Sequence, residues 1–457
     1  MKNFVKFLIT CFVFSLFVIP AQAKVVKTKE SVFANAVKAS SLDKMATIAV
    51  SVKDAKTGSV VYEYNQNKLL HPASTLKMFS TPAAIDILGK DYLFKTQLYL
   101  DKSNNLYVKL GADPLLTSTD LKYLIRNLKN QNIKVINNVY IDDSIIDNVE
   151  WGTGWMWDDE TNPYMTKFSA YNLDDNTFKI TVSKDENGQP AVQVGNTYPI
   201  GIINKVVPST ASNISVNRYN WNSPDIIELK GSVNSPVTLS VPVNNMRRYF
   251  VYKLTEFLNS DMIRYGSENF TSCIVPKDAK MIGEVAHSIN DVTPLVLKNS
   301  NNKAAETLCK VASAKVNNAT GTNELSVKLV KDFYTTRAVI VDNVVFADAS
   351  GASRNNLLTA DWMSSALNKL YSLDTFEYLQ SNMAQPGEGT LANRLFDLRG
   401  NVWLKTGTLS NLSSITGYVK SKNNKMYSVA IMIQNFDKSQ KEAKQLEDNI
   451  INLIYQL

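Results

Sequence analysis

The chain has 457 residues, which is too many for one compact core, so its length predicts two or three domains. Its 49 lysines and arginines against 42 aspartates and glutamates form no basic cluster, so we expect no nucleic-acid partner. With only two histidines and no His/Cys group at metal-ligand spacing, we expect no metal, no cofactor and no histidine-based triad. Lysine is therefore the residue type that remains as a candidate catalytic base.

The start of the chain, at 1–23, has the organisation of a secretory leader. Lys2 and Lys6 flank the start of an apolar run at 7–19, and Ala21 and Ala23 are the small residues of a cleavage site. Because the run is short for a membrane span, we expect cleavage, an exported periplasmic or extracytoplasmic protein, and no stable membrane anchor. An uncleaved anchor is the alternative. Loss of two lysines lowers the net charge from +7 to +5 (7 − 2), which suits an anionic polymer such as cell wall.

Two cysteines remain in the mature chain, Cys273 and Cys309. An oxidising compartment permits a disulfide between them, but two cysteines say nothing about geometry. Buried thiols are the alternative, and the sequence leaves the choice open.

The first predicted elements surround Ser74. Residues 47–55 and 59–65 predict two strands, and the Lys-Thr-Gly at 56–58 between them has the composition of a hairpin turn. A helix is predicted over 74–88, where Gly89 ends it. Pro82 inside this helix removes one backbone hydrogen bond and predicts a kink.

The chain changes character near residue 93. We expect an inserted region at 93–243, made of two nested subdomains, one mainly β and one α/β, within a catalytic domain formed by 24–92 and 244–457. An amphipathic helix is predicted at 120–129, and residues 188–243 have an all-β pattern. Three tryptophans at 151–157 are interpreted as core filling in preference to a ligand platform.

Helical periodicity returns after the insertion. The predicted elements are helices at 245–258 and 291–315, the second broken near 299–302, strands at 401–405, 415–420 and 426–434, and a final helix with a capping box at 439–442. We expect the apolar side of the final helix to pack on the sheet, with a membrane surface as the alternative.

Ser74 and Lys77 are one helical turn apart, so their side chains project from the same face, about 5–6 Å apart at Cβ. A helix start offers unpaired backbone N–H groups and a positive dipole. A neutral amine one turn away can remove the proton of a serine hydroxyl and activate it as a nucleophile. This spacing alone is weak, because Ser41/Lys44 and Ser300/Lys303 share it.

Three patterns occur in order: Ser74-x-x-Lys77, Ser300-Asn301-Asn302 and Lys405-Thr406-Gly407-Thr408. They resemble the Ser-x-x-Lys, Ser-Asp-Asn and Lys-Thr-Gly signature of serine β-lactamases and penicillin-binding proteins, with Asn301 as a departure at the middle position. Each pattern has the local context that the signature needs: a helix start, an inter-helix loop and the end of a strand.

The length of chain between the motifs narrows the resemblance to one family. The stretch of chain between Ser74 and Ser300 is far too long for a β-lactamase, because the insertion fills it. The chain resembles the class C low-molecular-mass penicillin-binding proteins, the D-alanyl-D-alanine carboxypeptidase/endopeptidase family. Four further stretches support this likeness: 111–114, 154–159, 348–354 and 387–390. The resemblance implies an α+β fold, with an antiparallel sheet flanked by helices and with inserted subdomains.

The motif residues agree with acyl-enzyme chemistry. Ser74 would attack a peptide carbonyl, with Lys77 as the base if burial beside Lys405 lowers its pKa. Ser300 is suited to relay a proton to the leaving amine, and Asn302 to hold the substrate amide.

The Lys405–Thr408 stretch is the expected substrate-binding strand. Lys405 and Thr408 can bind a terminal carboxylate, and the backbone N–H groups of Ser74 and Thr408 are the expected oxyanion hole. Ordinary loop and strand hydrogen bonding is the alternative for Asn302 and Thr408.

The family resemblance also implies a side pocket that reads diaminopimelate. Its matching residues are Asp159 and Arg354, one for the amine and one for the carboxylate, with an aromatic wall from Tyr164 or Phe168. Ser410 stands where some relatives have a longer side chain. A surface salt bridge or solvated charges are the alternative for Asp159 and Arg354.

The function implied is a serine DD-peptidase that cleaves terminal D-Ala-D-Ala, and in addition D-Ala cross-links. Its partners would be peptidoglycan stem peptides, with β-lactam antibiotics as inhibitors. A serine β-lactamase and a non-catalytic penicillin-binding sensor or scaffold are the alternatives. The long insertion argues against the first, and intact Ser74, Lys77 and Lys405 argue against the second.

Overall fold

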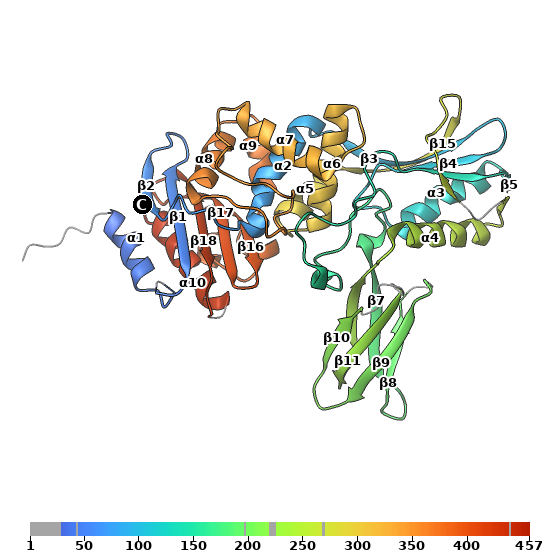
Figure 1. Ribbon diagram of the computed structural model, residues 1–457, viewed down its shortest axis with the longest axis horizontal. Helices are drawn as coiled ribbons and strands as arrows, with labels where there is room; N and C mark the ends of the chain where they lie inside the picture. Colours follow the sequence, from blue (N-terminus) through green and yellow to red (C-terminus); the bar gives the residue numbers. More distant parts are fainter. Residues whose placement is uncertain (1–28, 43, 196–197, 219–224, 267–269, 438–439) are drawn as a thin grey trace, which may run out of the picture.

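The computed structural model describes residues 29–42, 44–195, 198–218, 225–266, 270–437 and 440–457. The predicted leader at 1–23 and Ser439 of the predicted capping box lie outside these residues. Figure 1 shows a body of helices and one large sheet, from which two smaller units project. One unit combines strands with two helices, and the other consists of strands alone.

A five-stranded antiparallel sheet forms the centre of the body, in the order β16-β17-β18-β1-β2. Its strands are β1 (Thr47–Asp54), β2 (Val60–Tyr64), β16 (Val402–Leu409), β17 (Leu412–Lys420) and β18 (Met426–Gln434). All five correspond to strands predicted from the sequence. Thr47 pairs with Gln434, so strands from the two ends of the chain lie side by side in the middle of the sheet.

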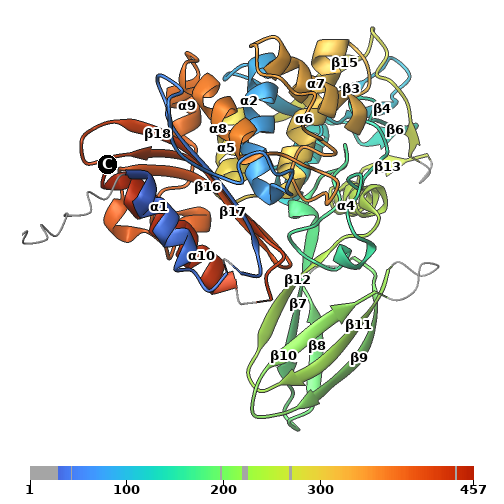
Figure 2. The same cartoon turned by 60° about the vertical axis from the view of Figure 1, so that its left-hand side comes forward.

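Helices cover both faces of this sheet. Helices α1 (Lys29–Lys38) and α10 (Gln440–Tyr455) lie against each other on one face, and α8 (Ala360–Tyr371) packs on the other (Figure 2). Successive residues of a strand point to opposite faces, so Ile431 joins the α10 side of the core and Met432 the α8 side. Burial on both faces explains the continuous apolar run of β18, and the predicted packing of the last helix on the sheet is confirmed.

A further layer of helices lies beside the sheet and positions the predicted motifs. It contains α2 (Lys77–Leu88), α5 (Ile289–Leu297), α6 (Asn302–Asn317), α7 (Asn323–Thr335) and α9 (Phe376–Ser381), with short 3-10 turns at Gly389–Leu391 and Phe396–Leu398. Helix α2 contacts α5, α6 and α7, and nearly all of its residues are buried. The helix break predicted near 299–302 is confirmed as the loop between α5 and α6.

The first projecting unit contains a second five-stranded sheet, in the order β14-β6-β4-β3-β15, and a short pair of strands. Its elements are β3 (Leu93–Leu100), β4 (Leu106–Lys109), α3 (Ser118–Asn130), β5 (Val135–Ile136), β6 (Val139–Asp142), α4 (Met246–Ser260), β13 (Arg264–Tyr265), β14 (Thr271–Ser272) and β15 (Lys280–Ser288). Because β15 pairs with β3, residues 246–288 complete this unit. The boundary that we placed at 243 is therefore corrected: the catalytic body resumes at α5.

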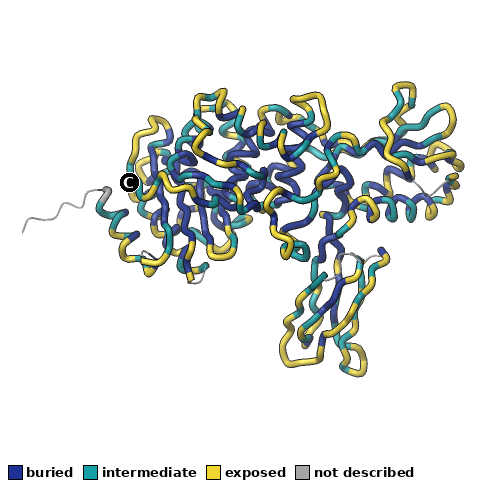
Figure 3. The backbone as a smooth tube through the Cα atoms, in the orientation of Figure 1, coloured by how far each residue is buried: buried dark blue, intermediate teal, exposed yellow. Residues whose placement is uncertain are grey.

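The second projecting unit, which we call the β-unit, spans residues 177–242 and matches the all-β prediction. Two three-stranded sheets form it, in the orders β12-β7-β8 and β10-β11-β9. The strands are β7 (Thr177–Lys184), β8 (Pro190–Val194), β9 (Gly201–Pro208), β10 (Asn213–Asn217), β11 (Ile226–Val233) and β12 (Val237–Pro242). In Figure 3, buried residues concentrate in the interior of the body, and exposed residues lie on its outer loops and on the far loops of the β-unit.

Candidate active site

Ser74 lies in a 3-10 turn, Ala73–Leu76, that leads directly into α2. Ala73 has a φ of 47°, a left-handed conformation that is uncommon for a residue with a Cβ atom. Two glycines close in on this turn: a Cβ on Gly351 would lie 1.9 Å from the Ala73 carbonyl oxygen, and one on Gly407 2.9 Å from that of Pro72. The 348–354 loop and strand β16 can therefore approach the serine turn only with glycine at these positions.

Lys77 is fully buried, and its Nζ contacts three oxygen atoms. These are Ser74 Oγ at 2.9 Å, Asn302 Oδ1 at 2.5 Å and the Ser350 carbonyl oxygen at 2.7 Å. The amide and carbonyl oxygens can only accept, so a neutral amine donates its two N–H groups to them and turns its lone pair toward the Ser74 hydroxyl. The arrangement is that of a base poised at a serine.

The pKa of Lys77 supports this reading. Burial lowers it to about 7, while the carboxylates of Asp348 and Glu306 act in the opposite direction. We expected Lys405 to be a cause of this lowering, but burial accounts for it. Close to pH 7, a large share of Lys77 is therefore the neutral amine.

Lys405 of β16 is also fully buried, and its Nζ donates to Ser300 Oγ and to the Thr406 carbonyl oxygen, both at 2.8 Å. Burial holds the pKa of Lys405 well below its usual range, and the charge of Lys77 lowers it further. The two lysines and the two serines thus form two hydrogen-bonded pairs, Lys77 with Ser74 and Lys405 with Ser300.

The loop between α5 and α6 carries the second motif. Ser300 has a φ of 65°, and Asn301 caps α6 by accepting a hydrogen bond from the Ala304 N–H at 2.9 Å. Asn and Asp cap helices about equally well, which explains why Asn301 can replace the aspartate of the usual motif. Asn302 joins two parts of the molecule, because its Oδ1 accepts from Lys77 while its Nδ2 donates to the Tyr164 carbonyl oxygen at 2.9 Å.

Glu306 is a site residue that the sequence reasoning missed. It is buried on α6, one turn after Asn302, and accepts hydrogen bonds from the backbone N–H groups of Ala349 at 3.1 Å and Ser350 at 2.8 Å. Burial, and then the charge of Asp348, raise the pKa of Glu306 to about 7. The available sequence signal was a carboxylate among the apolar residues of a helix.

Asp348 is the second buried carboxylate that was not singled out. It accepts hydrogen bonds from the backbone N–H groups of Gly351 and Ser353, both at 2.8 Å, and from Trp155 Nε1 at 2.9 Å. Asp348 and Glu306 together fix the 348–354 loop, whose Ser350 carbonyl oxygen contacts the amine of Lys77. The Trp155 bond ties the same loop to the tryptophan segment.

The predicted side-pocket residues lie close to each other without direct contact. Asp159 ends a short 3-10 turn, Trp157–Asp159. Its pKa is raised by burial and by the charge of Asp158, and the charge of Arg354 opposes this rise. No ion pair of 4.0 Å or less joins Asp159 to Arg354 among the described residues.

Of the two aromatic residues considered for the pocket wall, one is eliminated. Phe168 is fully buried and packs edge-on against Trp155, so it cannot line a pocket, whereas Tyr164 is 80% exposed. Trp155 is buried in the same small cluster and Trp151 packs against it, in agreement with core filling, but Trp157 is 72% exposed.

The remaining predicted residues stand at the end of β16. Thr406 is buried, whereas Thr408 and Ser410 are exposed. Direct hydrogen bonds therefore join Ser74, Lys77 and Asn302 in one group and Ser300 and Lys405 in a second, and the side chains of Thr408 and Ser410 belong to neither.

The two cysteines differ in their surroundings: both are free thiols, with Cys273 exposed and Cys309 buried. The disulfide considered from the sequence is thus not formed. Within the described ranges, no group of three or more His, Cys, Asp or Glu side chains could hold a metal ion. The same ranges contain no helix that is long and apolar enough to span a bilayer.

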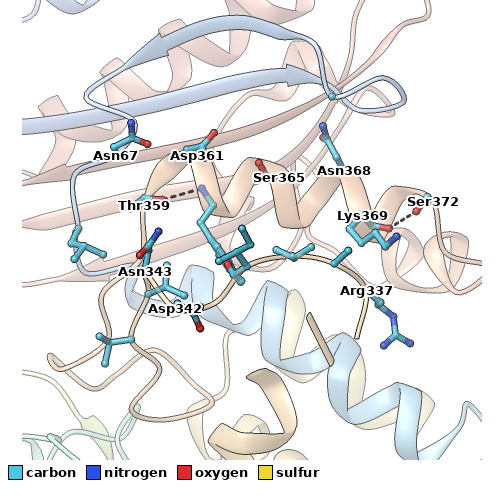
Figure 4. A pocket seen from close by; sticks show the side chains of 18 of the residues that line it. Asn67, Arg337, Asp342, Asn343, Thr359, Asp361, Ser365, Asn368, Lys369 and Ser372 are labelled. Carbon is cyan, nitrogen blue, oxygen red and sulfur yellow. Dashed lines mark hydrogen bonds between the residues drawn. The ribbon is translucent and has the colours of Figure 1, made fainter. Parts of the chain in front are cut away.

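A cavity of about 1140 Å³ lies away from these residues, between α8 and residues 337–345 (Figure 4). Its lining contains none of the predicted site residues, but it includes the Lys-Thr-Gly at 56–58. The backbone N–H of Thr57 donates to Asp54 Oδ1 at 2.9 Å, so this second Lys-Thr-Gly is a hairpin turn, as predicted.

Comparison with known proteins identifies the family. The model of the D-Ala-D-Ala carboxypeptidase 3 (S13) family matches residues 33–457. The chain belongs to this family. Among curated relatives, the D-alanyl-D-alanine carboxypeptidase DacB of Haemophilus influenzae is 24% identical over 443 residues, covering 90% of this chain and 91% of the relative. The D-alanyl-D-alanine carboxypeptidase of Actinomadura sp. (strain R39) is 26% identical over 407 residues, covering 82% and 75%.

A solved structure agrees with the S13 assignment at the level of the fold. The crystal structure of penicillin-binding protein 4 (dacB) from Haemophilus influenzae has a TM-score of 0.82 and 23% identity, covering 93% of this chain and 99% of that one. The α+β fold and the family expected from the sequence are confirmed. As a member of the S13 family, the chain is a serine hydrolase of the D-Ala-D-Ala carboxypeptidase type.

Proposed function

We propose that this DD-peptidase uses Ser74 as its nucleophile and Lys77 as its base. The observation that carries the proposal is the position of Lys77 Nζ, 2.9 Å from Ser74 Oγ and bound on its other sides by two oxygens that can only accept. Lys77 takes the proton as Ser74 attacks the carbonyl of the D-Ala-D-Ala bond, and an ester to Ser74 forms as the C–N bond breaks. Water then cleaves the ester and restores Ser74.

Ser300 and Lys405 serve the leaving group in this proposal. Ser300 delivers a proton to the leaving amine, and Lys405 and Thr408 bind the carboxylate of the terminal D-Ala. An incoming carboxylate favours the charged form of Lys405, whose pKa is otherwise lowered by burial. The backbone N–H groups of Ser74 and Thr408 stabilise the oxyanion, and Asn302 holds the substrate amide.

The test compares Ser74→Ala with Ser41→Ala, which removes the serine of a second Ser-x-x-Lys pattern. We expect Ser74→Ala to abolish both labelling by a fluorescent penicillin and release of D-Ala, while Ser41→Ala keeps both. Labelling that survives in Ser74→Ala would overturn the nucleophile. Rapid loss of label from the wild-type protein indicates a β-lactamase, and no label at all indicates a non-catalytic sensor.

We also propose that Asp159 and Arg354 bind the amine and carboxylate of a diaminopimelate side chain, with Tyr164 beside them and Ser410 at the end of β16. The electrostatic interaction between Asp159 and Arg354, without a closed ion pair between them in the described residues, supports this pocket. We expect Arg354→Ala to slow hydrolysis of a D-Ala-D-Ala peptide with diaminopimelate by about tenfold. Arg354→Ala should not change hydrolysis of the same peptide with an uncharged residue in place of diaminopimelate. The control variant Arg126→Ala, on α3, should slow hydrolysis of neither peptide. Equal slowing of both peptides contradicts the pocket.

The predicted leader at 1–23 supports a site of action outside the cytoplasm. We propose that the enzyme is exported and acts on peptidoglycan stem peptides, with β-lactams as covalent inhibitors. N-terminal sequencing of the exported protein is expected to begin at Lys24. A chain that retains Met1 contradicts cleavage.

A further inference from the structure

The cavity of about 1140 Å³ beside α8 has no part in the roles assigned above. Residues 337–345 form one of its walls and run antiparallel to the helix. Val345 exchanges two backbone hydrogen bonds with Leu357, just before α8, and the Ile340 carbonyl oxygen accepts one from Trp362 Nε1 at 2.9 Å, in its first turn. The cavity is therefore an elongated cleft that follows the helix, and we call it the α8 cleft.

The two ends of the α8 cleft carry opposite charges. Asp342 lies at the end where α8 begins, and Lys369 lies at the other end (Figure 4). Lys56 joins Lys369 there, because its hairpin turn approaches the second half of the helix: a Cβ on Gly58 would lie 3.4 Å from Asn368 Nδ2. One acidic side chain thus faces one end of the cleft, and two basic side chains face the other.

These three charged side chains are free to bind a ligand. None of them forms an ion pair of 4.0 Å or less in the part of the chain that the structure describes. The other charged residues of the lining are already in ion pairs, Asp361 with Lys53 at 2.5 Å and Arg337 with Asp86 at 2.7 Å. The cleft therefore attracts an anionic group at one end and a cationic group at the other.

Between its charged ends, the cleft offers amide groups and apolar surface. The side-chain amides of Asn67 and Asn343 line it and make no hydrogen bond within the described ranges. Such an amide both donates and accepts, so it can pair with the N–H or the C=O of a peptide. Leu69, Ile340 and Val345 add exposed aliphatic side chains to the same lining, and these can cover apolar parts of a ligand.

The length of the cleft selects a short peptide. The ten residues from Thr359 to Lys369 rise about 15 Å, at about 1.5 Å per residue of helix. An extended peptide rises about 3.4 Å per residue, so about four or five residues span this distance. A single amino acid is too short to reach both charged ends, and an uncharged sugar chain would leave both without a partner.

We propose that the α8 cleft binds an extended peptide of about four or five residues, with its carboxylate at Lys56 and Lys369 and its amine at Asp342. Binding is non-covalent. The lining of the cleft contains none of the residues assigned to catalysis, so the inference goes beyond the proposed function and does not depend on it.

The first experiment measures the dissociation constants of L-alanine peptides of two to six residues by isothermal titration calorimetry. We expect the tightest binding for the peptides of four and five residues with free ends. Acetylation of the amine or amidation of the carboxylate should each weaken the binding of tetra-alanine by about fivefold, the value of one exposed ion pair. Because these peptides lack D-Ala, they are no substrates for the proposed reaction.

Two variants locate the ends of the bound peptide. Lys369→Ala should weaken binding of free tetra-alanine by about fivefold and leave the peptide with an amidated carboxylate unchanged. Asp342→Ala should weaken the free peptide and leave the one with an acetylated amine unchanged. Lys122→Ala, which removes an exposed lysine of α3, is the matched control and should change neither affinity.

Several results would overturn the inference: no binding of any peptide, an affinity that rises steadily with length, or equal losses for free and blocked peptides. Tighter binding of an N-acetylglucosamine tetramer than of tetra-alanine would show a sugar site instead. Ser74→Ala should bind tetra-alanine as the wild type does, and a loss in that variant would move the peptide to the catalytic centre. Failure of Ser74 as the nucleophile, by contrast, would leave the peptide affinities as expected.

Discussion

Lys77 shows at the scale of one residue how burial produces a base. Its amine contacts three oxygens, and a pKa of about 7 leaves part of the population neutral. The carboxylates of Glu306 and Asp348 limit this effect, because an opposite charge favours the ammonium ion. Glu306, which binds the 348–354 loop, therefore raises the pKa of Lys77 without contact with substrate.

We predict that Glu306→Gln moves the acid limb of the acylation profile to lower pH. The amide keeps an acceptor for the N–H groups of Ala349 and Ser350 but removes the negative charge, so the pKa of Lys77 falls and its neutral form appears at lower pH. The measurement is the rate of penicillin labelling from pH 5 to 9. An unchanged limb, or one moved to higher pH, contradicts the prediction.

Glu447→Gln is the control for the Glu306 experiment. Glu447 is also a fully buried carboxylate, whose pKa is raised by burial, but it lies on α10 and contacts Ser413 and Arg394. The variant should lower the melting temperature while leaving the pH profile of acylation as in the wild type. A shift common to both variants would point to a general loss of packing.

At the scale of elements, the site depends on how closely the 348–354 loop approaches the serine turn. We predict that Gly351→Ala reduces the acylation rate by about 10²-fold, the size expected for a misplacement of about 1 Å. The reason is that the added Cβ meets the carbonyl oxygen of Ala73 at 1.9 Å, so the turn that carries Ser74 must move. Rates of penicillin labelling and melting temperatures, compared with those of a glycine variant elsewhere in the chain, provide the measurement.

Gly188→Ala separates backbone strain from this steric effect. Gly188 has a φ of +75° and Gly351 of +79°, so both alanine variants carry a similar strain, about 1–2 kcal/mol. An added Cβ at Gly188 meets no atom within 4 Å. Gly188→Ala should therefore lose some stability and acylate at the wild-type rate. If the two variants acylate equally fast, the approach of the loop does not position Ser74.

At the scale of the whole molecule, the sequence predicted what depends on neighbouring residues. The pairing of Ser74 with Lys77 spans one helical turn, the Lys-Thr-Gly at 56–58 is a hairpin turn, and residues 426–434 form a strand. Each of these features is decided within a few residues. Their agreement with the structure follows from helix and strand geometry alone.

What the sequence did not predict depends on distant partners. Nothing within residues 280–288 indicates that they pair with β3, which lies far earlier in the chain, so the domain boundary was misplaced. The importance of Glu306 arises only when α6 packs against α2 and the 348–354 loop folds over both. The sequence could not choose between Tyr164 and Phe168, since burial of an aromatic ring is settled by the contacts around it.

The pairing of β1 with β18 also decides when activity can arise. Thr47 and Gln434 come from nearly opposite ends of the chain, so the central sheet forms through contacts of very high sequence separation, which close slowly. A growing chain that has not reached β16 already contains Ser74 and Lys77 but lacks Lys405, and Ser300 has no amine beside it. Assembly of the catalytic centre therefore needs the C-terminal strands, and we expect chains truncated before β16 not to be acylated by penicillin.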